Sequence, residues 1–134
     1  MALQYSVAVR NAQLDTFETT VGATAKLQIR TGAQPANCAA AASGTLLCEM
    51  TLPADYLSAA SGGTKSLSGS WTGTASGTGA AAHFRIVDNA GTTCHLQGSV
   101  TATGGGGDLQ VDNTSINSGQ TCTVTAFSMT RGNA

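Results

Sequence analysis

The sequence predicts an all-β sandwich or barrel, built as one domain over residues 1–134 and preceded by a single helix. The first observation is a hairpin pattern in residues 83–101, where two alternating runs flank the turn-forming residues 89–92. The second is a series of short alternating segments separated by long loops rich in Gly, Ser, Thr and Ala. The third is the length, which allows a core without disulfides or a metal.

Residues 6–21 have the period of an amphipathic helix. Four apolar side chains fall within about a quarter-turn of one another, namely Val7, Leu14, Phe17 and Val21. Gly22 supplies a stop signal, and Arg10 lies inside the apolar stripe. A helix of this kind usually packs on its own domain. The alternative is that residues 1–22 form a helical arm that reaches a neighbouring subunit.

The next segments predict three strands and one long loop. Residues 25–31 alternate as a half-buried strand, and residues 32–44 have no period and are typical of a surface loop. Residues 46–52 form a second strand, which Pro53 ends. Within residues 67–71, alternate side chains share a face and predict a third, short strand.

The second half of the chain predicts loops of two kinds around the hairpin. Residues 72–82 have too little apolar surface to offset their ordering entropy, so we expect a flexible loop. Residues 102–107 end in four glycines and allow an unusual turn. Residues 109–111 and 121–130 complete the strands, and a change of apolar face in the last one indicates either a bulge near Ala126 or burial on both sides.

The four cysteines predict buried free thiols rather than a metal site. Their spacing contains no CxxC pair and no zinc-knuckle pattern. Three of them fall in alternating runs beside apolar neighbours, where a small thiol is usually buried: Cys48, Cys94 and Cys122. A disulfide is the alternative if the protein leaves the cell, with Cys38 as the unpaired cysteine because it lies in a loop.

Composition excludes several classes of partner. The net charge is −1, only 10% of residues are charged, and the basic residues are scattered singly. Nucleic-acid binding therefore has no electrostatic basis. No apolar run approaches the roughly 18 residues that cross a bilayer, and residues 1–9 do not resemble a signal peptide, so we expect no membrane partner and synthesis in the cytoplasm. A weakly charged surface suits an assembly, and suits a Ser/Thr-rich soluble domain equally well.

No catalytic constellation can be built from the polar residues. With Asp88 opposite Thr93 in the hairpin, His95 would face Ile86, and the imidazoles of His95 and His83 would lie on opposite faces of the sheet. Asp108 and Asp112 share an outward face of a short strand, where charges usually discourage sheet extension. Residues 104–107 lack the Lys-Ser/Thr of a phosphate loop. We therefore predict no enzyme, no metal and no cofactor.

Sugar binding would need exposed aromatic platforms. The candidates are Trp71, Tyr5 and Tyr56. Because Trp71 shares its face with Leu67, we assign it to the core.

Three segments carry a family resemblance. They are residues 83–130 (HFRIVDNAGTTCHLQGSVTATGGGGDLQVDNTSINSGQTCTVTAFSMT), residues 5–22 (YSVAVRNAQLDTFETTVG) and residues 27–44 (LQIRTGAQPANCAAAASG). All three resemble small virion proteins of tailed bacteriophages. In size and character the chain is similar to the cement, or head-decoration, proteins of short-tailed phages. This resemblance implies a jelly-roll antiparallel β-sandwich on the outer surface of a capsid.

The resemblance also implies partners and a location. The protein would bind the major capsid protein and stabilise the shell by bridging its subunits, as a dimer or trimer. We expect the interface with the capsid, or with other copies, to include Leu3, Tyr5 and Arg10. The alternative function is a receptor- or glycan-binding module of a tail fibre or spike.

Overall fold

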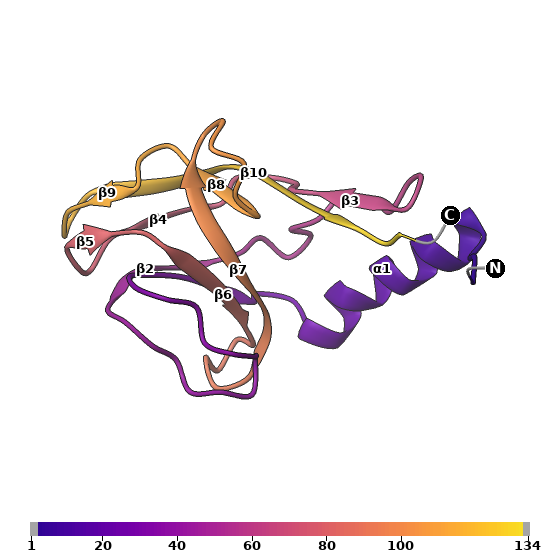
Figure 1. Cartoon of the computed structure of the whole chain (residues 1–134), viewed down its shortest axis with the longest axis horizontal. Helices are drawn as coiled ribbons and strands as arrows, with labels where there is room; N and C mark the ends of the chain where they lie inside the picture. The colour runs from indigo at the N-terminus through magenta and orange to yellow at the C-terminus, as the bar shows by residue number, and fades with distance from the viewer. Residues whose placement is uncertain (1–2, 133–134) are drawn as a thin grey trace.

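The computed structural model describes residues 3–132, and it consists of one helix followed by ten short strands. The sheet curls into a body, and the helix lies to one side of it, beside the C-terminal end of the chain (Figure 1). The elements are α1 (Val7–Val21), β1 (Lys26–Arg30), β2 (Leu46–Thr51), β3 (Thr64–Ser66), β4 (Thr72–Thr74), β5 (Gly79–Ala80), β6 (His83–Val87), β7 (Cys94–Ala102), β8 (Leu109–Val111), β9 (Ser115–Ile116) and β10 (Thr121–Thr130).

Local signals define both ends of α1. The Ser6 hydroxyl accepts a hydrogen bond of 3.2 Å from the Val9 N–H, which is the usual N-cap arrangement. Gly22, at φ +92°, follows the last turn, and its N–H donates to the Glu18 carbonyl over 2.9 Å. The predicted helix is confirmed at both ends.

The main sheet has the strand order β2-β1-β6-β7-β8-β10-β3, and β4 also pairs with β10. Its far edges approach each other, since the Ser76 N–H beyond β4 donates to the Leu47 carbonyl of β2 over 2.8 Å, and Cys48 forms a bridge with Ala75. β5 and β9 form a separate two-stranded sheet. The structure is therefore mostly β, with a curled sheet and one N-terminal helix.

One strand pair differs from the predicted antiparallel sheet, because β7 and β8 are parallel. Parallel neighbours usually need a connection of about a dozen residues or more, whereas residues 103–108 connect these two. Gly104 and Gly106 have φ angles of +84° and +80°. A Cβ on Gly105 or Gly107 would lie only 2.7–2.8 Å from the Thr101 side chain. The glycine run therefore folds tightly against β7, and this tight connection allows β8 to run parallel to β7.

The hairpin of β6 and β7 is confirmed, but its register differs from the prediction. The Asp88 N–H donates to the Thr93 carbonyl over 3.0 Å, as expected. A bulge then shifts the pairing between Ile86 and Val87, so that Leu96, and not His95, lies opposite Ile86. A bulge leaves one residue unpaired, and the alternation of side chains does not reveal it.

The prediction of a flexible loop over residues 72–82 is wrong. β4 pairs with β10, β5 pairs with β9, and Ala75 and Ala81 are buried. The small residues are required here, because a Cβ on Gly73 would lie 2.8 Å from the Met50 Cβ. Backbone hydrogen bonds and close approach to β2 order this segment, although it lacks large apolar side chains.

The prediction of a strand over residues 67–71 is wrong, because these residues form the connection between β3 and β4. β3 ends at Ser66 and β4 begins at Thr72, with Gly69 at φ +74° in between. Trp71 is buried, as predicted, and its indole N–H donates to the Tyr56 carbonyl over 3.1 Å.

An aromatic cluster connects the strands of the core. The Phe127 ring centroid lies 5.4 Å from that of Trp71 and 5.9 Å from that of Phe84. Phe127 reaches this position because the register of β10 shifts between Val124 and Ala126, which confirms the predicted bulge. Beyond Phe127, β10 pairs with β3 and runs beside α1. We call α1, β3 and the end of β10 the extension.

Candidate functional site

A buried lysine paired with two carboxylates near the surface holds the helix of the extension to β3. Lys65 is only 3% exposed, and its ammonium lies 2.7 Å from the Asp15 carboxylate and 3.0 Å from the Glu18 carboxylate. Burial alone would lower the pKa of Lys65, but the hydrogen bonds to Asp15 and Glu18 outweigh it and raise the pKa above its usual value. The ammonium is therefore charged and paired.

Further hydrogen bonds fix the N-terminal half of α1 to the end of β10. The Arg10 guanidinium donates to the Arg131 carbonyl over 3.3 Å, and the Arg131 Nε donates to the Gln13 side-chain oxygen over 3.0 Å. The Gly63 N–H donates to the Asn11 side chain over 2.9 Å. Hydrogen bonds as well as the chain itself therefore hold α1 in place within the extension, which we describe as braced.

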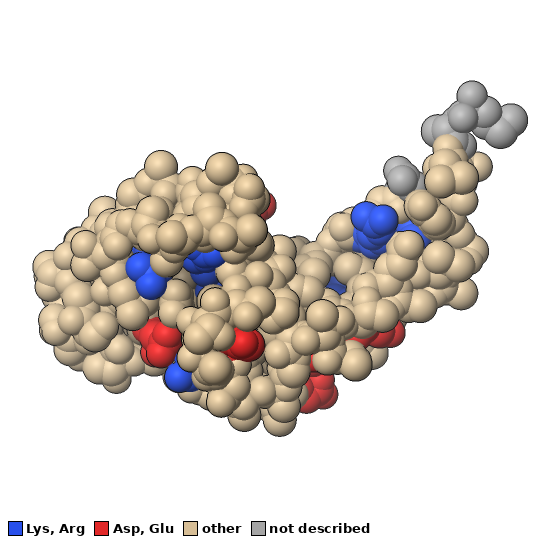
Figure 2. Space-filling model, turned by 90° about the horizontal axis from the view of Figure 1, so that it is seen from below, with Lys and Arg blue, Asp and Glu red and all other residues tan. Residues whose placement is uncertain are grey.

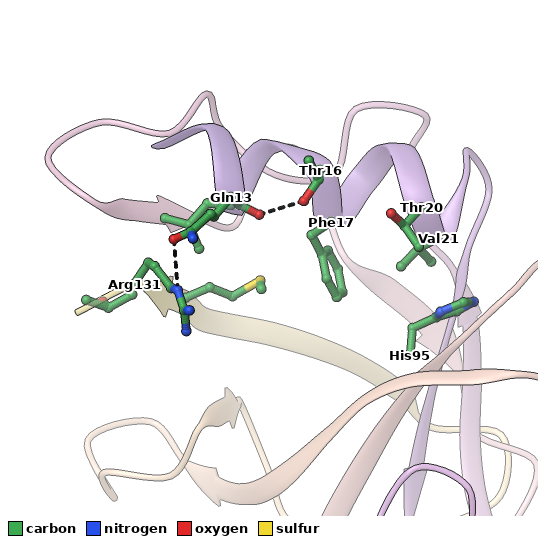
Figure 3. A pocket seen from close by; sticks show the side chains of 10 residues that line it. Gln13, Thr16, Phe17, Thr20, Val21, His95 and Arg131 are labelled. Atoms are coloured by element: carbon green, nitrogen blue, oxygen red, sulfur yellow. Dashed lines mark hydrogen bonds between the residues drawn. The ribbon is translucent and has the colours of Figure 1, made fainter. Parts of the chain in front are cut away.

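A hollow of about 490 Å³ lies between α1 and β10. Figure 3 shows Phe17 pointing from the helix into this space, with Arg131 at one end and His95 of β7 at the other. Its apolar lining comes from Leu14, Phe17, Val21 and Met129. It is a shallow, mainly apolar groove with hydroxyl groups along the rim, and its lining contains no pair of acid and base side chains.

The three predicted interface residues lie in different environments. Leu3 is 70% exposed, Tyr5 is half-buried, and Arg10 is only 8% exposed and bonded within the chain. The prediction of an interface at Leu3, Tyr5 and Arg10 is untested, and Leu3 is the one whose side chain is free to meet a partner.

Two further apolar residues are exposed, namely Val7, which the sequence placed in the apolar stripe of the helix, and Val9, which it did not single out. Val7 and Val9 are 48% and 44% exposed, and with Leu3 they are the large exposed hydrophobic residues in the range 3–132. Val7 has the period of the inward stripe. Arg10 and Asn11 form hydrogen bonds with Arg131 and Gly63, however, whereas the side chains of Val7 and Val9 in the preceding turn are exposed. We call Leu3, Val7 and Val9 the apolar tip.

The other polar candidates serve the fold. The His83 ring nitrogen Nδ1 lies 2.9 Å from the Gly32 carbonyl, whereas His95 lines the groove. The Asp108 carboxylate accepts hydrogen bonds from the Ser99 N–H and hydroxyl, both at 3.0 Å, and the Asp112 carboxylate accepts one from the Thr123 N–H. Each pair connects neighbouring strands, so these carboxylates stabilise the sheet.

The described residues contain neither a metal-binding cluster nor a membrane-spanning helix. Within 3–132, no group of three or more His, Cys, Asp and Glu side chains could hold a metal ion. No helix in that range is long and apolar enough to cross a membrane. On the face seen in Figure 2, charged side chains are few and scattered, and the molecule narrows toward the extension.

Comparison with known proteins finds no matching family model, no matching curated protein and no matching solved structure.

Proposed function

We propose that this chain is a structural virion protein that binds the outer surface of a phage capsid and stabilises the shell by bridging major capsid subunits. The observation that carries the proposal is the apolar tip, Leu3, Val7 and Val9, presented at the end of a braced extension. The resemblance of residues 83–130 to virion proteins supports it, and in this proposal the curled sheet is the counterpart of their jelly-roll sandwich.

The apolar tip fits a docking role because exposed aliphatic side chains gain free energy when a partner covers them. Burial of apolar surface contributes about 25 cal/mol per Å², so three such residues supply a few kcal/mol per copy. The bracing by Lys65 and Arg10 reduces the entropy lost on docking, since the helix is already held in place. Modest contacts of this size then add up over a symmetric lattice.

Shell stabilisation follows from differential binding. A protein that binds the assembled shell more tightly than free subunits shifts the equilibrium toward the assembled state. Nothing in this mechanism requires catalysis, a metal or a cofactor. A weakly charged surface favours close packing of copies, and we propose that a dimer or trimer forms on the shell.

The alternative function, a glycan-binding module of a tail fibre or spike, has less support. Trp71 and Tyr56 are buried, which leaves half-buried Tyr5 as the one remaining aromatic platform that the sequence suggested. No observation favours this function over capsid binding.

The first test is the copy number of the polypeptide relative to the major capsid protein in purified particles. A ratio near one, or a simple fraction of one, is the expected result for a protein that covers the lattice. A few copies per particle would contradict the proposal and favour a position in the tail.

The second test changes the apolar tip. We expect Leu3→Ser, Val7→Ser and Val9→Ser combined to weaken binding to shells that lack the protein by at least tenfold, with unchanged helix content by circular dichroism. Ala8→Ser with Ala12→Ser is the matched control, because both residues are exposed on the same helix. Equal binding by the two variants would contradict a docking role for the tip.

A further inference from the structure

The fold brings the four cysteines together in two pairs, although each pair joins distant parts of the sequence. Cys38, in the loop between β1 and β2, and Cys94, at the start of β7, line the same small hollow. Cys48 of β2 lies beside Gly73, the residue that pairs with Cys122 of β10. All four are free thiols in this structure. Cys38, expected to stand alone because it lies in a loop, has a partner.

Arg85 positions the pair of Cys38 and Cys94, which we call the outer pair. This buried side chain of β6 donates hydrogen bonds from Nη2 to the carbonyls of Cys38, at 2.8 Å, and Ala40, at 3.0 Å. Cys94 lies beside β6 as well, since it pairs with Val87. The loop that carries Cys38 is therefore held against the strand that neighbours Cys94.

Solvent reaches the outer pair. Cys38 and Cys94 are both partly exposed, and both line a hollow of about 210 Å³ that also contains Arg30, Arg85 and the loop residues Ala39–Ala42. A small disulfide reagent can approach a thiol in such a position without unfolding of the core.

Cys48 and Cys122, which we call the inner pair, lie in the core on both sides of Gly73. Cys122 pairs with Gly73 across the sheet, and a Cβ on Gly73 would lie 3.3 Å from the Cys48 sulfur. Cys48 is 0% exposed and Cys122 is 1% exposed. Burial, followed by the effect of Cys122, raises the pKa of Cys48 to about 12, and a reagent cannot reach a thiol buried to this degree without opening of the core.

We propose that Cys38 and Cys94 are an oxidation site and form a disulfide in the folded protein, whereas Cys48 and Cys122 stay reduced. The oxidant is a low-molecular-weight disulfide such as oxidised glutathione. A thiolate of the pair attacks it to form a mixed disulfide and releases one glutathione. The second cysteine thiol then displaces the other glutathione. The two cysteines lose two electrons and two protons, which the oxidant takes up as two thiols.

The bond fastens the long loop between β1 and β2 to the start of β7. Cross-links across distant parts of a chain restrict the unfolded state, and an oxidising environment favours them. Burial first, and the neighbouring Cys94 thiol second, raise the pKa of Cys38 to about 11. Because the fraction of thiolate increases with pH below the pKa, oxidation proceeds faster as the pH rises from 7 to 9.

The test is disulfide mapping of the folded wild-type protein after incubation with oxidised glutathione at pH 8. Cleavage after Lys and Arg and before Asp places Cys38 and Cys48 on peptide 31–54, Cys94 on peptide 88–107 and Cys122 on peptide 112–131. We expect peptide 31–54 linked to peptide 88–107, with Cys38 identified by fragmentation, and Cys122 still free. A link to peptide 112–131, or glutathione adducts without any link, would overturn the proposal.

Two single variants provide the matched comparison. Cys38→Ser should abolish the link and leave a glutathione adduct on Cys94, whereas Cys48→Ala should keep it. Oxidation should also raise the midpoint of thermal unfolding of the wild type, by on the order of 5–10 °C, and leave that of Cys38→Ser unchanged. If Cys48→Ala does not fold, the fragmentation spectrum of the wild-type link still assigns the bond.

Discussion

The Lys65 ammonium lies 2.7 Å from the Asp15 carboxylate, and this contact connects β3 with the middle of α1. Lys65 connects two helical turns to β3, because Glu18 of the next turn accepts from the same ammonium at 3.0 Å. The long aliphatic stem of the lysine is buried on the way to these carboxylates. The position of the apolar tip therefore depends on an ion pair and not on apolar packing alone.

Lys65→Ala should lower the free energy of unfolding by about 1–3 kcal/mol, because it removes a buried stem and leaves two carboxylates without their cation. Lys65→Met keeps the stem and should cost less. Urea unfolding followed by circular dichroism measures both. Equal stability of Lys65→Ala and the wild type would show that the ion pair does not hold the helix.

Acid should weaken the contact between Lys65 and Asp15. The hydrogen bonds from Lys65 and from the Ala60 N–H lower the pKa of Asp15 below its usual value of 3.8. A lowered pKa in the folded state means that this contribution to stability is present above that value and is lost as the pH falls through the folded pKa. The midpoint temperature of thermal unfolding should therefore decrease once the pH is below about 4.

Asp15→Asn tests this assignment. The variant should be less stable than the wild type at pH 6 and should show a smaller loss between pH 5 and pH 2. Asp55→Asn is the control, since Asp55 is an exposed carboxylate elsewhere on the chain. If the acid profiles of Asp15→Asn and the wild type are parallel, Asp15 does not contribute to the transition.

Alkaline pH should destabilise the core. Burial, with a smaller effect of Glu18, raises the pKa of Tyr56 to about 12 from 10.0, and burial with the effect of Cys122 raises that of Cys48 to about 12 from 9.0. A raised folded-state pKa means that the stability is present below the unfolded value and is lost as the pH rises through the folded value. Stability should therefore fall between about pH 9 and pH 12.

Tyr56→Phe distinguishes the contribution of Tyr56 to the loss of stability at alkaline pH from that of Cys48. The Tyr56 hydroxyl is buried and has no hydrogen-bond partner among the described residues, so the variant should be neutral or slightly stabilising at pH 7. Above pH 10 it should lose less stability than the wild type. Tyr5→Phe, at a half-buried position outside the core, is the control for the loss of a tyrosine hydroxyl.

Gly73→Ala should destabilise the protein by about 1–3 kcal/mol, because the new methyl group would press against Met50 and Cys48 where β4 approaches β2. Gly132→Ala is the control, since a Cβ at Gly132 would meet no atom within 4 Å. Chemical unfolding followed by the fluorescence of Trp71, the single tryptophan, measures the difference. Equal midpoints would contradict the close approach of the two strands.

Several elements could be predicted because their causes are close together in the chain. Ser6 and Gly22 cap a helix within one turn of each end. Alternation predicted β1 and β2, and the turn at Asp88 closes the hairpin through neighbouring residues. The bulge near Ala126 was visible as a change of apolar face within a single strand.

The order of residues 72–82 could not be predicted, because it depends on distant partners. β4 is fixed by hydrogen bonds to β10 and by contact with β2, and neither leaves a local pattern. The same holds for Arg10, which is polar but buried against Arg131, and for Val7, which is apolar but exposed. In the candidate site, Leu3 was recognised from the sequence and Val9 was not.

The sequence by itself determined the helix, the strand-rich class and the weakly charged surface, because propensity, periodicity and composition act over a few neighbouring residues. Only the tertiary structure decided the parallel pair of β7 and β8, the partners of Cys38 and Cys48, and the bracing of the extension by Lys65. These features arise where segments far apart in the chain meet, and the free energy of such contacts depends on their geometry.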